Sequence, residues 1–130
     1  MKNIELFDRY ASVILSRLYE KFPCRDTVFI SEIASEEIDP EQELTTNLQI
    51  ARETFIWLAL SGYLMFEKDN YYAFQKAVLT ERGLRLLNEV PDSLKSKKTL
   101  GERLVNAIKV GAQETAREIL RKMISRGVGE

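Results

Sequence analysis

The first twenty-two residues alternate apolar and polar positions with the period of a helix. Aromatic and aliphatic residues recur at steps of three and four, with charged and polar residues between them: Phe7, Tyr10, Ile14, Leu18 and Phe22. This spacing places the apolar side chains on one face of a helix. It predicts an amphipathic helix that ends before Pro23, because proline lacks the amide hydrogen that a helix interior needs.

The next segment predicts a short strand and two helices. Residues 27–30 are β-branched and aromatic, as strands prefer, and Ser31 is placed to cap a brief helix. Asp39-Pro40, with Gln42 three residues after the aspartate, has the pattern of a capping box and predicts the start of a longer helix. Ser61-Gly62 ends that helix. Its apolar face consists of Leu44, Leu48, Ala51, Phe55 and Leu58.

From Tyr63 the period changes to two, which is typical of strands. Residues 63–67 and 71–75 predict the two arms of a β-hairpin, and Lys68-Asp69-Asn70 predicts its turn. Thr80 is placed to cap a further helix that runs to about Pro91. The aromatic residues of the hairpin either pack on the core or form an exposed strip for a protein or for stacked bases: Tyr63, Phe66, Tyr71, Tyr72 and Phe74.

The last segment predicts one long helix from about Thr99 to about Arg126, with roughly seven turns. Its apolar stripe needs a partner, and two arrangements are open. The helix packs back on the first helix of its own chain, or it also forms a dimer interface, which we favour slightly. Glu102, Glu114 and Glu118 dilute its basic charge, so membrane-surface binding is not expected. The candidate dimer residues are Leu104, Val105, Ile108, Ala112, Thr115, Ile119 and Met123.

This order of elements resembles the winged-helix fold, a helix-turn-helix whose third helix leads into a hairpin "wing". The resemblance is carried by VFISEIA at 28–34, WLALSGYL at 57–64 and LTERGLRLL at 79–87. The expected fold is mainly α with a small β-hairpin. A winged helix-turn-helix domain spans 1–92, and a linker and long C-terminal helix span 93–130, packing on that domain, on a second subunit, or on both. The resemblance implies a transcription regulator whose third helix enters the major groove of DNA.

The charge of the helix-turn-helix segment opposes DNA binding. Residues 26–43 contain seven acids and no Lys or Arg, although a DNA-binding surface must neutralise phosphates. The side chains that could read or contact DNA in the alternative interpretation are Thr46, Asn47, Gln49, Arg52 and Lys68. The same acids offer a candidate surface for a protein partner: Glu32, Glu36, Glu37, Glu41 and Glu43.

The residue inventory argues against an enzyme. The chain has no His and one Cys, Cys24, so it lacks a histidine-based catalytic pair, a His-based metal site and a thiolate cluster. We expect no catalytic residues, no metal and no cofactor. The N-terminal residues reach an acid by Glu5 without an apolar signal core, and no window suits a membrane span, so we expect a cytoplasmic protein.

The net charge of −1 is a cancellation between two parts of the chain. Residues 1–94 hold 10 basic and 16 acidic side chains, whereas residues 95–130 hold 9 basic and 4 acidic ones. An acidic body and a basic tail should attract each other within a chain or between chains. The sequence therefore favours a non-enzymatic regulatory or adaptor module that acts through protein contacts and self-association, and the alternative is a dimeric DNA-binding transcriptional regulator.

Overall fold

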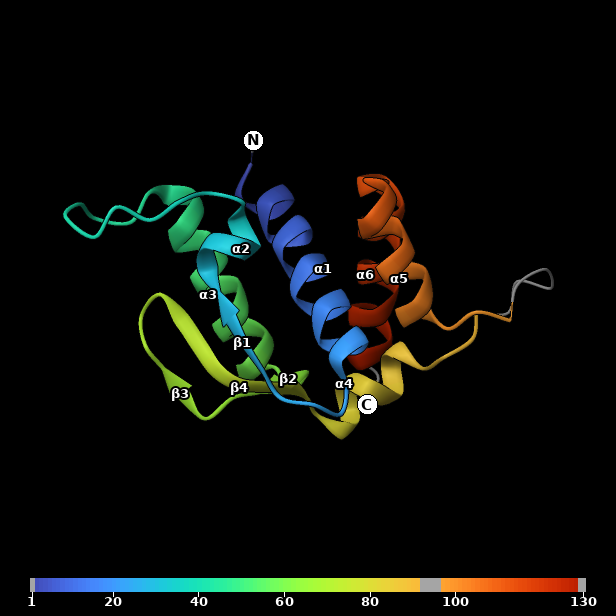
Figure 1. Cartoon of the computed structure of the whole chain (residues 1–130). Coiled ribbons are helices and arrows are strands. Elements are labelled where there is room, and N and C mark those ends of the chain that lie inside the picture. Colours follow the sequence, from blue (N-terminus) through green and yellow to red (C-terminus); the bar gives the residue numbers. More distant parts are fainter. Residues whose placement is uncertain (1, 92–96, 129–130) are drawn as a thin grey trace.

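The computed structural model describes residues 2–91 and 97–128. Within them, the structure has six helices and a small antiparallel sheet, and α1 (Asn3–Lys21) lies between the sheet and the two C-terminal helices (Figure 1). One side of α1 packs on α3 (Thr46–Leu60) and the sheet, and the other side packs on α5 (Leu100–Val110) and α6 (Gln113–Val128). The mainly helical class with a small β element is therefore confirmed.

Helix α1 matches its prediction, and its central place explains why it is buried on two sides. Tyr10, Ile14 and Leu18 lie in the main core. Asp8 and Ser12 are also buried, although both are polar. The periodic apolar pattern accounts only for the side of α1 that packs on α3 and the sheet. The contact with α5 and α6 also includes polar side chains.

The sheet is built around β4 (Ala73–Leu79). It pairs with β1 (Asp26–Phe29) on one side and with β2 (Leu64–Met65) and β3 (Lys68–Asp69) on the other, always antiparallel. The predicted hairpin is present, but its turn was placed wrongly. Lys68 and Asp69 pair with Gln75 and Phe74, so the turn lies beyond Asp69, and Tyr71 there adopts a φ of 68°.

The segment between α2 (Ile30–Ala34) and α3 corrects two predicted caps. Helix α2 already begins at Ile30 without a side-chain cap, so Ser31 does not start it. Asp39 accepts a bond from the Glu41 amide at 3.0 Å in an isolated turn, and α3 begins only at Thr46, with Thr45 as its cap. The predicted buried face is confirmed for Leu48, Ala51, Phe55 and Leu58, whereas Leu44 lies before the helix although it too is buried.

Helix α4 (Glu81–Leu87) begins at its predicted cap, since the Thr80 side chain accepts a hydrogen bond from the Gly83 amide at 3.0 Å. It ends at Leu87, earlier than the predicted end near Pro91. Gly83 is buried against the backbone of Tyr63, the residue directly before β2. A Cβ at this position would stand 2.0 Å from the Tyr63 carbonyl oxygen, so only glycine allows this close approach.

The prediction of a single long C-terminal helix is wrong, because this segment forms two helices. Helix α5 starts with the predicted Thr99, which forms a capping box with Glu102, but it ends at Gly111, whose φ of 73° is left-handed. The chain reverses there, and α5 and α6 form a helical hairpin that packs on α1 (Figure 1). The interpretation that the tail packs on the first helix of its own chain is confirmed. Residues 92–96, which include most of the expected linker, lie outside the described residues.

Candidate interaction surface

The polar residues at the start of α3 are bonded within the chain. Thr45 donates a hydrogen bond to the Glu36 carboxylate, and Asn47 donates another to the same carboxylate at 3.3 Å. The Gln49 side chain donates to the Leu44 carbonyl oxygen at 3.0 Å. Asn47 and Gln49 therefore help to fix the start of the helix, while Thr46 remains exposed.

Arg52 is held by the hairpin. Its guanidinium group donates to the Asp69 carboxylate at 2.8 Å and to the Tyr71 carbonyl oxygen at 2.9 Å, and it lies 5.2 Å from the centre of the Tyr71 ring. The bond from Arg52 lowers the pKa of Asp69 and raises the pKa of Arg52. Arg52, a candidate for DNA contact in the alternative interpretation, is thus part of the hairpin's own support, and Lys68 beside it is exposed.

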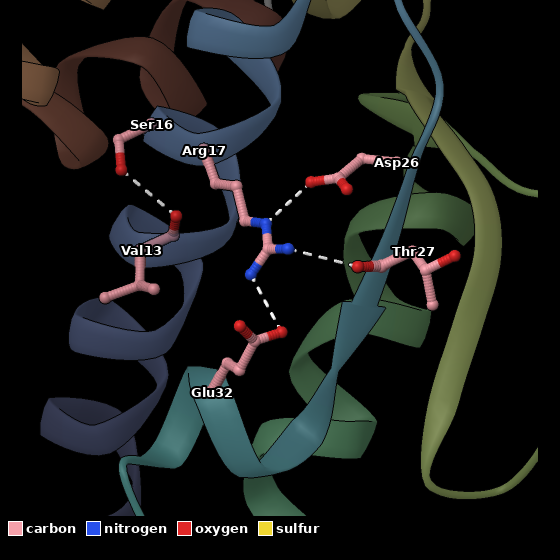
Figure 2. A network of polar contacts seen from close by, with 6 residues as sticks. All are labelled: Val13, Ser16, Arg17, Asp26, Thr27 and Glu32. Atoms are coloured by element: carbon pink, nitrogen blue, oxygen red, sulfur yellow. Dashed lines mark hydrogen bonds and ion pairs between the residues drawn. The ribbon is translucent and has the colours of Figure 1, made fainter.

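Two of the five predicted acidic surface residues are likewise engaged within the chain. Arg17 of α1 donates to Asp26 at 2.7 Å and to the Thr27 carbonyl oxygen at 3.1 Å, and it pairs with Glu32 at 3.0 Å (Figure 2). Glu36 binds the start of α3, as described above. Glu37, Glu41 and Glu43 are exposed. Arg17 also satisfies a carbonyl of β1, so the same side chain joins α1, α2 and the sheet.

The predicted dimer residues divide between the core and the surface. Leu104, Ile119 and Met123 are buried inside the single chain, so they do not form a surface that a second copy could contact. Val105, Ile108 and Ala112 are half-buried, and Thr115 is exposed. Most of the apolar stripe that predicted a partner therefore packs against α1 of the same chain.

The structure contains a groove that the sequence did not indicate. Helices α1, α3 and α6 enclose an open hollow of about 700 Å³ with mainly apolar walls. Trp57 on α3 is 42% exposed there, and its ring packs edge-on against Phe7 with 5.2 Å between the ring centres. The lining residues are Asn3, Ile4, Phe7, Gln49, Ile50, Glu53, Thr54, Trp57, Arg121 and Ile124.

An ion cluster around the buried Asp8 positions the arginine at the edge of this groove. Asp8 is only 3% exposed, and its Oδ2 atom lies 3.1 Å from Arg117 Nε. Arg121 Nη2 donates to Oδ2 at 3.1 Å and also lies 2.8 Å from Oδ1, without the angle of a hydrogen bond. Asp8 therefore holds α6 against α1 and fixes where Arg121 reaches the groove.

The remaining chemistry of the described residues is sparse. No group of three or more His, Cys, Asp or Glu within 2–91 and 97–128 is placed to hold a metal ion. In that same part of the chain, no helix is long and apolar enough to cross a bilayer. Comparison with protein-family models, curated proteins and solved structures found no match.

Proposed function

We propose that this chain is a winged-helix regulatory or adaptor module, without catalytic activity, that acts through protein contacts and associates with itself. The proposal depends on one observation: polar side chains of α3 form hydrogen bonds with acids of the same chain. Arg52 is bonded to Asp69 and Asn47 to Glu36, so a duplex would have to compete with acids that already occupy them. Base contacts made without phosphate anchors also give little affinity.

The order of helix, strand, two helices, hairpin and helix supports the winged-helix assignment. The apolar groove supports protein contacts, because a concave apolar surface bordered by a few polar groups is the usual form of a binding site. Exposed apolar side chains at such a groove lower the free energy when another surface covers them.

Retention on a column of random-sequence DNA at low salt tests the proposal. We expect the chain to elute without salt-dependent retention, since phosphate-driven binding must weaken as salt rises. The variants to run beside it are Arg52→Glu and Lys68→Glu, with Lys122→Glu on the exposed side of α6 as a matched charge control.

Strong retention that is lost in Arg52→Glu and Lys68→Glu, but not in Lys122→Glu, would establish the DNA-binding alternative at α3 and the hairpin. Retention that is lost in Lys122→Glu alone would assign the contact to the basic tail. Either result would contradict a function based on protein contacts only.

A further inference from the structure

An exposed ridge of α3 borders the groove. Gln49, Glu53 and Leu60 lie at steps of four and seven, so they share one side of the helix, next to the side that carries Ile50 and Trp57. Leu60 is 83% exposed, the largest exposed fraction among the large hydrophobic residues of the described chain. We call these three residues the α3 ridge. The surface thus has a hollow and, beside it, a protruding edge that ends in an apolar side chain.

The two walls of the groove carry opposite charges. Glu53 stands on the α3 wall, and Arg121 stands on the α6 wall, fixed there by Asp8. Helices α3 and α6 run in the same direction, and both end near Tyr63, against which Gly127 packs (Figure 1). One turn further along each helix, Trp57 faces the groove from α3 and Ile124 faces it from α6.

We propose that a second copy of this chain covers the groove, with the α3 ridge of each copy lying in the groove of the other. The inference rests on the proposed function, since it names the partner for one of the protein contacts. A two-fold axis parallel to the groove produces this arrangement, because such an axis exchanges the ridge and the groove of the two copies.

This symmetry also matches the charges and the apolar residues. Rotation about this axis leaves the direction of α3 unchanged. The α3 ridge of one copy therefore runs parallel to the partner's α3 and α6, which form the walls of the partner's groove. Glu53 then faces the partner's Arg121, and Leu60 lies at the end lined by the partner's Trp57 and Ile124. Both pairs occur twice in the dimer, so one patch supplies its own complement in shape and in charge.

A second copy explains the surface better than an unrelated apolar segment does. A peptide lying in the groove would cover Trp57 and Ile124, but it would leave Leu60 on the neighbouring ridge in water. The reciprocal arrangement covers both. It also differs from a dimer through the outer faces of α5 and α6, where the buried Leu104, Ile119 and Met123 have nothing to offer a partner.

Sedimentation equilibrium of the full chain, from about 1 to 100 μM, tests the proposal. We expect a monomer–dimer equilibrium that Leu60→Glu and Glu53→Arg each weaken by about tenfold or more, because one buries an unpaired charge and the other opposes two arginines. Val110→Glu is the matched control. It places a charge on another exposed apolar residue, at the end of α5, and it should leave the dissociation constant unchanged.

Trp57 is the only tryptophan of the chain, so its emission reports directly on the groove. We expect its emission maximum to move to longer wavelength on dilution of the unaltered chain, as the partner leaves, and to stay constant in Leu60→Glu. A mixture of Glu53→Arg with Arg121→Glu should restore the dimer. In that mixture each position 53 faces a charge of opposite sign at position 121, whereas each variant alone opposes like charges.

A chain that stays monomeric at 100 μM would overturn the proposal together with the self-association in the proposed function, whereas a dimer with another interface would overturn this proposal alone. A dimer that survives both Leu60→Glu and Glu53→Arg would have such another interface, whatever the effect of Val110→Glu. A monomer that binds the dye ANS, with binding lost in Leu60→Glu, would indicate a different occupant and would also overturn this proposal. If Arg121→Glu unfolds, as circular dichroism would show, the two α3 variants decide alone. None of these results depends on the DNA column.

Discussion

Single side chains in this molecule often serve the fold where their position suggested a ligand. Arg52 was a candidate for DNA contact in the alternative interpretation, but it supports the hairpin through Asp69 and the Tyr71 carbonyl. Tyr71 has a positive φ, which is unfavourable for a bulky residue, and the Asp69 carboxylate and Arg52 hold it there by accepting from its amide and donating to its carbonyl. The sequence did not predict this contact between Arg52 and Asp69. Asp69 was assigned to the turn of the hairpin, whereas it lies in β3.

Removal of this support should loosen the end of the hairpin. We expect Arg52→Ala to lower the free energy of unfolding by about 1 kcal/mol, since the pair is partly exposed and its strength is reduced by solvent. Urea denaturation measures the change. Lys68→Ala, a neighbouring exposed residue, is the control and should change stability by less than about 0.5 kcal/mol. Equal effects of the two substitutions would contradict the role given to Arg52.

The same pair predicts a dependence on pH. The pKa of Asp69 is lowered from its ordinary value of 3.8 by the bond from Arg52. The contribution of Asp69 is therefore complete above pH 3.8 and is lost as the pH falls from there through the lowered pKa, because the unfolded chain binds the proton first. In urea titrations, the stability difference between the unaltered chain and Asp69→Asn should shrink below pH 3.8. A difference that is constant from pH 6 to pH 2 would contradict it.

At the scale of elements, residue patterns predicted the helices and strands but not all of their ends. The cap at Thr80 was predicted correctly, and Thr99, predicted only as the approximate start of a helix, forms a capping box with Glu102. Asp39 had an equally good local pattern, yet it caps only a turn, and Thr45 begins α3. At Gly111 the apolar spacing continues through the break, so periodicity alone predicted one helix where there are two.

Gly83, in the first turn of α4, and Gly111, at the end of α5, should respond differently to substitution. Gly83→Ala places a methyl group 2.0 Å from a backbone oxygen, so the hairpin and α4 must separate, and we expect a loss of about 3 kcal/mol. Gly111→Ala has open space around it and meets only the strain of its positive φ, for a loss of about 1 kcal/mol. Thermal unfolding of both variants measures the order. A larger effect at Gly111 would show that the close approach of Gly83 to Tyr63 is easily relieved.

At the scale of the whole molecule, the division of charge predicted an attraction between the acidic body and the basic tail, and the structure shows individual ion pairs between them. The basic tail meets the acidic body through Arg117 and Arg121 with Asp8, and through Lys109 with Glu20, whose charged atoms are 3.1 Å apart. The groove could not be predicted in this way. Its walls come from the first residues of α1, the outer side of α3 and the end of α6, and no local pattern links segments so far apart in the chain.

The ion cluster between α1 and α6 should respond asymmetrically when its members are removed. Asp8 is 3% exposed, whereas the side chains of Arg117 and Arg121 are nearly half exposed. Replacement of both arginines by alanine leaves a buried carboxylate without a counter-charge, so we expect a loss of about 3 kcal/mol. Asp8→Ala leaves two arginines that can turn into solvent, and its loss should be about 1 kcal/mol.

Adding Asp8→Ala to the double arginine variant should therefore recover stability, because it removes the isolated buried charge. Urea denaturation of the three variants, at equal salt, measures this thermodynamic cycle. If Asp8→Ala proved the most damaging change and gave no recovery in the triple variant, Asp8 would act mainly by packing. The anchor of α6 would then have to lie in its apolar contacts with α1 and α5, and Arg121 would lose the support that places it at the groove.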